Sequence, residues 1–211
     1  MRLSGVGIEQ IVQLADAMIA AERCVTSTQR PAPPRCFALV GTLGAGKTRF
    51  CQEIARACGI DPAEVTSPTF TLLKSYDCAD HADSSAAPQR LHHLDWYRIT
   101  DEDELWQLGL DELWETPGDW TLIEWADRFP ESMPLDTIWI RIRATDTTDH
   151  APANHSDTGS DLSFREIEFQ TDDPDHRHWL TEVKNHLVTA GFTGTIEPLL
   201  NDGSAEIAGD G

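Results

Sequence analysis

The sequence predicts an α/β fold, a three-layer sandwich in which helices enclose a mostly parallel or mixed central sheet. Short apolar runs typical of buried strands alternate with segments of helical periodicity, and one such run leads through a glycine-rich loop into a helix. The length of 211 residues suits one domain. We expect this domain to span 1–190, with inserted loops near 78–90 and 144–162 and a flexible acidic tail over 191–211.

The first part of the chain is predicted to form a helix, a strand and a second helix. Apolar residues at helical spacing predict the first helix over 7–22, and a proline-rich connector follows it. Cys36–Val40 is a continuous apolar run, which favours a strand buried on both faces. Beyond the glycine-rich loop, Phe50 and Ile54 share one helical face, and Gly59 is a natural C-terminal cap.

The remainder of the chain supplies further strands and two helices. The expected strands are 69–73, 91–95, 121–124, 137–143 and, with alternating polarity, 164–169. Residues 101–115 and 175–190 carry apolar side chains at helical spacing, so we expect them to cover the faces of the sheet.

Charge and hydropathy exclude two classes of protein. The 36 acidic residues against 16 basic ones give a net charge of −20, and nucleic-acid affinity depends largely on Lys and Arg contacts to phosphates. No apolar run approaches the ~18–20 residues that a membrane helix requires. We therefore expect neither strong direct RNA binding nor a membrane protein, and any RNA contact should be local or made by a partner.

The five cysteines form an odd set without a CxxC pair, and the first residues lack the apolar core of a signal peptide. We therefore expect a cytoplasmic protein with reduced thiols. Zinc bound by Cys78 with His81, His92 or His93 is the alternative, but the spacing matches no recognised zinc pattern. Ordinary buried or surface roles are the favoured interpretation.

The glycine-rich loop carries the phosphate-binding (Walker A) pattern, Gly41-x-x-x-x-Gly46-Lys47-Thr48, in its required place between a buried strand and a helix. A merely tight turn would not need Lys-Thr after the last glycine. Backbone N–H groups and the helix dipole favour phosphate there, so a P-loop NTPase-like fold is predicted. Lys47 should neutralise the β- and γ-phosphates, and the Thr48 hydroxyl should ligate Mg²⁺. The predicted nucleotide-binding residues are Gly41, Thr42, Leu43, Gly44, Ala45, Gly46, Lys47, Thr48 and Arg49.

Two acids follow apolar runs at the ends of predicted strands. A phosphate-binding loop needs a second magnesium-orienting carboxylate, usually at the end of a neighbouring buried strand. Glu124 closes the run that begins at Trp120, and Asp95 closes the run that begins at Leu91. Either acid could instead be a solvated group at a strand end, and the residues by themselves leave the division of roles open.

Four ordered motifs within residues 8–143 resemble those of the TsaE family, the ATPase component of the bacterial machinery that makes threonylcarbamoyladenosine in tRNA. They are Gly44-Ala-Gly-Lys-Thr48, Val65-Thr-Ser-Pro-Thr-Phe-Thr-Leu72, His93-Leu-Asp-Trp-Tyr-Arg98 and Leu122-Ile-Glu-Trp125. Thr42 stands where the family usually has Asp, and Trp96 where it usually has Leu, but neither removes a phosphate or metal ligand.

The resemblance implies ATP and Mg²⁺ as cofactors, slow intrinsic ATP hydrolysis, and activation by protein partners of the tRNA threonylcarbamoyl-transferring complex. It implies that Ser67 to Phe70 act as a switch near the γ-phosphate, with Thr69 as the main polar contact. The family's metal ligands fall on Thr48 and Glu124, and Asp95 falls on the acid that assists hydrolysis. The expected catalytic residues are therefore Lys47, Thr69, Asp95 and Glu124.

Two other classes of function stay open. A small-molecule kinase with a P-loop shares the first strand–loop–helix unit, but such kinases bring arginines over the transferring phosphate, whereas Arg90, Arg98 and Arg128 are scattered. A nucleotide-sensing module without hydrolysis is the other class, because a sequence shows ligands and not rates. Phe70 and Trp125 are either surfaces that ATP binding exposes or buries, or parts of the core.

Overall fold

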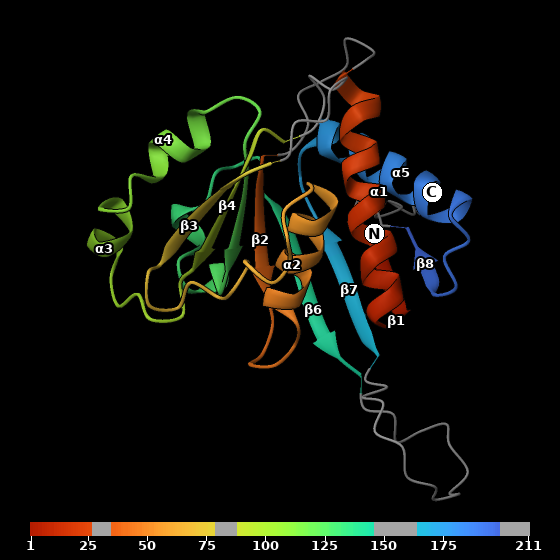
Figure 1. The fold of residues 1–211 in the computed structure, drawn as a ribbon, viewed down its shortest axis with the longest axis horizontal. Coiled ribbons are helices and arrows are strands. Elements are labelled where there is room, and N and C mark those ends of the chain that lie inside the picture. Colours follow the sequence, from red (N-terminus) through yellow and green to blue (C-terminus); the bar gives the residue numbers. More distant parts are fainter. Residues whose placement is uncertain (27–34, 79–87, 146–163, 199–211) are drawn as a thin grey trace, which may run out of the picture.

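The computed structural model describes residues 1–26, 35–78, 88–145 and 164–198 (Figure 1), and the predicted α/β class is confirmed. In chain order the elements are β1 (Arg2–Val6), α1 (Ile8–Thr26), β2 (Cys36–Val40), α2 (Lys47–Ala57), β3 (Leu73–Asp77), β4 (Arg90–Asp95), α3 (Glu102–Trp106), α4 (Leu110–Glu115), β5 (Trp120–Glu124), the short 3₁₀ helices η1 (Ala126–Arg128) and η2 (Pro130–Ser132), β6 (Ile138–Ala144), β7 (Arg165–Gln170), α5 (Pro174–Thr189) and β8 (Thr195–Glu197).

The strands form one eight-stranded mixed sheet in the order β3-β4-β5-β2-β6-β7-β1-β8. The four inner strands β4, β5, β2 and β6 run parallel to one another. Strands β3, β7, β1 and β8 extend this parallel centre with antiparallel pairs. Of the two predicted sheet types, the mixed one is therefore correct, and the parallel part holds the strand that leads into the glycine-rich loop.

Two apolar clusters, one on each face of the sheet, make the fold three-layered. Helices α1, α2 and α5 cover one face, where Phe37 of β2 packs against Trp120 of β5 with ring centroids 4.7 Å apart. Trp179 of α5 also belongs to this aromatic group, with its ring centroid 6.2 Å from that of Trp120. On the other face, Leu105 and Leu110 belong to the second cluster, and Figure 1 shows α3 and α4 near β3 and β4, away from α1 and α5.

The single helix expected over 101–115 is wrong, because it is divided into α3 and α4. Gly109 lies between them with a left-handed backbone (φ 69°), a conformation that glycine adopts without steric cost. The strand expected at 69–73 is also wrong. Residues 69–71 form a turn, closed by a 2.7 Å hydrogen bond from the Leu72 N–H to the Pro68 carbonyl, and β3 begins only at Leu73.

Strands β1 and β8, at the two ends of the described chain, were not predicted. Leu3 of β1 is fully buried and lies opposite Ile167 of β7 and Ile196 of β8. The flexible tail is thus wrong for Thr195–Glu197, because β8 extends the sheet there. Residues 199–211 of that tail, and most of the loops expected near 78–90 and 144–162, lie outside the described residues.

The described part of the chain bears on two further expectations. None of its helices has both the length and the apolar character needed to cross a membrane. Four of its cysteines, Cys36, Cys51, Cys58 and Cys78, are free thiols. His81, one partner of the zinc alternative, lies outside the described residues. The described residues include no metal-binding group that joins Cys78 to His92 or His93.

Candidate functional site

The candidate site lies where the inner parallel strands end. Asp95 and Glu124 are the last residues of β4 and β5 and are paired in register, and Glu124 also lies opposite Leu39 of β2. The glycine-rich loop begins directly after β2, at Gly41. Because the carboxyl ends of parallel strands share one edge of the sheet, motifs distant in sequence meet there, which is the usual place of ligand sites in α/β folds.

Two glycines in the loop are required by its conformation. A Cβ atom on Gly41 would lie 2.4 Å from the Ile142 carbonyl oxygen of β6, a distance that no real Cβ keeps. Gly46, at the start of α2, has a φ of 109°, a backbone conformation that residues other than glycine rarely adopt. The loop therefore depends on glycine at both positions, at Gly41 for its close approach to β6 and at Gly46 for its backbone conformation.

We expect Gly41→Ala to lower the free energy of unfolding by about 1–3 kcal/mol, because the loop must move away from β6 to admit the methyl group. Urea denaturation of the variant against the unmodified chain measures the change. Thr42→Ala is the matched control, because it places alanine at the adjacent position of the same loop, where the side chain is exposed. Equal midpoints for both variants would contradict the close contact between Gly41 and β6.

Lys47 turns its ammonium back onto its own loop. The Nζ atom donates to the Gly41 carbonyl at 2.7 Å and to the Thr42 carbonyl at 3.0 Å, and it lies 3.6 Å from the centre of the Trp125 ring. Burial lowers the pKa of Lys47, whereas the carboxylates of Glu124 and Asp95 act in the opposite direction. A buried ammonium held by carbonyls and an aromatic face is ready to exchange these partners for phosphate oxygens.

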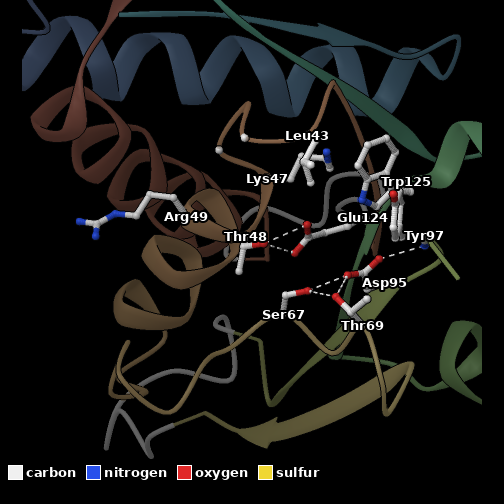
Figure 2. A pocket seen from close by; sticks show the side chains of 12 residues that line it. Leu43, Lys47, Thr48, Arg49, Ser67, Thr69, Asp95, Tyr97, Glu124 and Trp125 are labelled. Atoms are coloured by element: carbon white, nitrogen blue, oxygen red, sulfur yellow. Dashed lines mark hydrogen bonds between the residues drawn. The ribbon is translucent and has the colours of Figure 1, made fainter. Parts of the chain in front are cut away.

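Thr48 and Glu124 form a pair, as the metal-site prediction requires. The Thr48 hydroxyl lies 2.8 Å from Oε1 and 3.0 Å from Oε2 of Glu124, and the carboxylate is 3% exposed. Figure 2 shows both side chains meeting from α2 and β5. A hydroxyl and a carboxylate side by side are oxygen donors of the kind that Mg²⁺ prefers, so the residues present fit this ion.

Asp95 is bound to the expected switch segment. Its Oδ2 accepts hydrogen bonds from the hydroxyls of Ser67 at 2.6 Å and Thr69 at 2.7 Å, and its Oδ1 accepts one from the backbone N–H of Tyr97 at 2.9 Å (Figure 2). Asp95 is 2% exposed, so it is not a solvated acid at a strand end. Asp95, at the end of β4, therefore holds the turn at residues 69–71, which was predicted to be a strand.

These groups line one cavity of about 380 Å³. Its lining residues are Leu43, Gly44, Gly46, Lys47, Thr48, Arg49, Ser67, Thr69, Asp95, Tyr97, Glu124 and Trp125. The other predicted loop residues do not line it: Gly41 and Thr42 offer their carbonyls to Lys47, and Ala45 is buried. Arg49 reaches the rim, but in Figure 2 its side chain points away from the Thr48–Glu124 pair, and it forms a 2.7 Å ion pair with Glu53.

The two aromatic residues with open interpretations have different surroundings. Phe70 is 82% exposed, so the core interpretation is wrong for it, and the Arg98 guanidinium lies 4.1 Å from its ring centre. Trp125 is half-buried and has a left-handed backbone (φ 62°), and its ring centroid lies 5.0 Å from that of Tyr97 with the two planes tilted by 45°. Trp125 therefore contributes to the wall of the cavity and to the environment of Lys47.

Sequence reasoning did not place two residues, Arg165 and His93, at this site, although both touch it. Arg165, at the start of β7, donates from Nε to the Ala45 carbonyl at 3.0 Å and so supports the glycine-rich loop. No local pattern signals this contact, because 120 residues separate the two positions. His93 contacts Glu124 at 2.8 Å, and its place two residues before Asp95 on the same strand was the available signal.

Comparisons with known proteins cover the residues around the cavity. The model of a family described as "Threonylcarbamoyl adenosine biosynthesis protein TsaE" matches residues 9–151. The "tRNA threonylcarbamoyladenosine biosynthesis protein TsaE" of Rickettsia bellii is 34% identical over 115 residues, which are 54% of this chain and 72% of the relative. The protein of that name from Bacillus subtilis is 40% identical over 111 residues, 53% of this chain and 63% of the relative.

A solved structure is similar over a longer part of the chain. The crystal structure of Bacillus subtilis YdiB matches with a TM-score of 0.57 and 26% identity, covering 88% of this chain and 95% of that one. Every residue that lines the cavity falls within the range matched by the family model, whereas Arg165 lies beyond it.

Proposed function

Since the chain belongs to the TsaE family and takes part in tRNA threonylcarbamoyladenosine biosynthesis, we propose that it is a cytoplasmic, Mg²⁺-dependent P-loop ATPase. In this proposal it supports threonylcarbamoyl modification of adenosine in tRNA by acting on partner proteins of the transferase complex. One observation carries the proposal: the Lys47 ammonium, the Thr48–Glu124 pair and the Asp95-bound switch line the same cavity.

The chain's own groups suffice to bind a triphosphate. The N-terminus of α2 presents backbone N–H groups at the cavity, and Lys47 adds the positive charge that the β- and γ-phosphates need. Phosphate oxygens would take the place of the Gly41 and Thr42 carbonyls that now accept from Nζ. Thr48 and Glu124 would hold Mg²⁺, which when bound neutralises charge on the phosphates.

Asp95 assists hydrolysis by placing the switch. Both of its oxygens are engaged by donors, two hydroxyls and one amide, so it positions other groups in this arrangement. Thr69 lines the cavity and is held by this carboxylate, which makes its hydroxyl the polar contact for the terminal phosphate. A residue that fixes a donor before the reaction lowers the cost of reorganisation in the transition state.

Partner dependence follows from a shortage of cations at the cavity. Among the described residues that line it, Arg49 is the only arginine, and it points away from the Thr48–Glu124 pair. Phosphoryl-transfer enzymes that receive an arginine from a second protein gain ~10³–10⁵ in rate. A partner that covers the exposed rim, which includes Leu43 at 81% exposure, is placed to supply such a group.

The test measures phosphate release at fixed salt by the chain alone and then with its cognate partner proteins. We expect slow ATP turnover by the chain alone and an increase in turnover of up to ~10³–10⁵-fold when partners are added. The isolated chain should bind tRNA weakly because of its net charge of −20. Fast hydrolysis that partners leave unchanged would contradict partner activation. Phosphate transfer to a small molecule would favour a kinase, and nucleotide binding without turnover in either condition would favour a sensing module.

A further inference from the structure

On the premise that the proposed Mg²⁺ site is correct, we propose that His93 is a positioning residue that holds the Glu124 carboxylate in its metal-binding orientation. His93 Nε2 lies 2.8 Å from Glu124 Oε1, inside the fold, where the histidine is 0% exposed and the glutamate 3%. Because the imidazole is fully buried, this contact is made in the interior and not at the protein surface.

The spacing of two residues between His93 and Asp95 explains how one strand serves both carboxylates. Side chains at positions i and i+2 of a strand project from the same face. His93 is paired in register with Leu122, and Asp95 with Glu124, so both β4 side chains lie next to the end of β5. Asp95 binds the switch hydroxyls while His93 binds Glu124. Strand β4 thereby fixes the switch and the metal-binding acid relative to each other.

The hydrogen-bond pattern determines which ring nitrogen carries the proton. An ionised carboxylate only accepts, so His93 must donate from Nε2. Its Nδ1 is buried and has no hydrogen-bond partner in the described part of the chain. Within the described residues, the His93 side chain therefore has one hydrogen-bond partner, which is Glu124.

With His93 and Thr48 both bonded to Oε1, the carboxylate is held between two donors from different elements. Hydrogen-bond partners behind a metal ligand orient it, and their loss typically reduces metal affinity 10–100-fold. Without the imidazole, Glu124 could rotate about its last side-chain bond and give up the orientation that faces Thr48. Nucleotide contacts that do not involve the metal should be unaffected.

His92 is the matched control because it is the adjacent histidine on the same strand. It is 3% exposed and bonds to Ser75 at 2.8 Å and Asp119 at 3.2 Å, on the face of β4 opposite to Glu124. His92→Leu removes the same ring from the same strand and should reduce stability without changing metal binding. It separates general damage to β4 from loss of the contact with Glu124.

The experiment measures Mn²⁺ affinity of the ADP complex by electron paramagnetic resonance, and ADP affinity in EDTA by calorimetry. We expect His93→Leu to weaken Mn²⁺ binding about 10-fold or more, with ADP affinity in EDTA unchanged. His93→Gln, whose amide nitrogen reaches the place of Nε2, should restore most of the affinity. His93→Asn, whose shorter amide does not reach it, should not.

Wild-type Mn²⁺ affinity in folded His93→Leu would overturn the proposal, as would an equal loss in His92→Leu. If His93→Leu does not fold, the comparison of His93→Gln with His93→Asn decides, and equal affinities for these two would also overturn it. A wild-type chain that binds no Mn²⁺ with nucleotide would instead refute the proposed Mg²⁺-dependent function, so the two failures are distinguishable.

Discussion

Lys47→Ala is expected to weaken ATP binding about 100-fold, because it removes a buried ammonium that faces the phosphate-binding loop. The fold should persist with a stability loss of about 1 kcal/mol, since the side chain contributes two hydrogen bonds to loop carbonyls and a contact with Trp125. Isothermal titration calorimetry gives the affinity, and circular dichroism confirms the fold.

Lys74→Ala is the control for the loss of a positive charge. Lys74 lies on the edge strand β3, where its Nζ atom donates to the Thr66 hydroxyl at 2.7 Å, and it does not line the cavity. It should leave ATP affinity within a factor of about two, as expected for a partly exposed charge outside the cavity. Unchanged affinity in folded Lys47→Ala would remove the assignment of this loop as a phosphate-binding site.

Glu124→Gln is expected to reduce ATP hydrolysis by about 10²–10³-fold while reducing nucleotide binding much less, because a metal-held charge acts mainly as the transition state develops. The amide also replaces one of the two oxygens that now lie against Thr48. Single-turnover hydrolysis across a magnesium titration measures the effect, and we expect the requirement for magnesium to rise.

Asp127→Asn is the control, because it removes a nearby carboxylate that influences Lys47 but is exposed and does not line the cavity. Its hydrolysis should stay close to that of the unmodified chain. If Glu124→Gln keeps full turnover while Asp95→Asn abolishes it, the roles assigned to the two carboxylates are reversed.

Local patterns in the sequence are enough to predict several parts of the fold. The apolar run Cys36–Val40 becomes β2 with all its residues buried, and the glycine spacing after it leads into α2. The expected strands ending at Asp95 and Glu124 are β4 and β5. These predictions hold because hydrophobic periodicity, glycine conformation and capping act over a few residues.

Local patterns misassigned segments whose conformation depends on distant partners. The run from Thr69 to Leu73 has the composition of a strand, but its hydroxyl at Thr69 is bound by Asp95, and this bond favours a turn. Strand β8 has only three residues and exists because β1 offers it an open edge. Propensity is a weak determinant where a tertiary hydrogen bond or an unpaired strand edge competes with it.

The tertiary structure alone decided how the site is assembled. Thr48 and Glu124 are 76 residues apart, and only the parallel order of β4, β5 and β2 brings them within 2.8 Å. The same order places His93 behind Glu124 at 2.8 Å. A sequence specifies which side chains are present and on which element they lie. Which of them touch depends on strand order and register, which arise from burying the sheet as a whole.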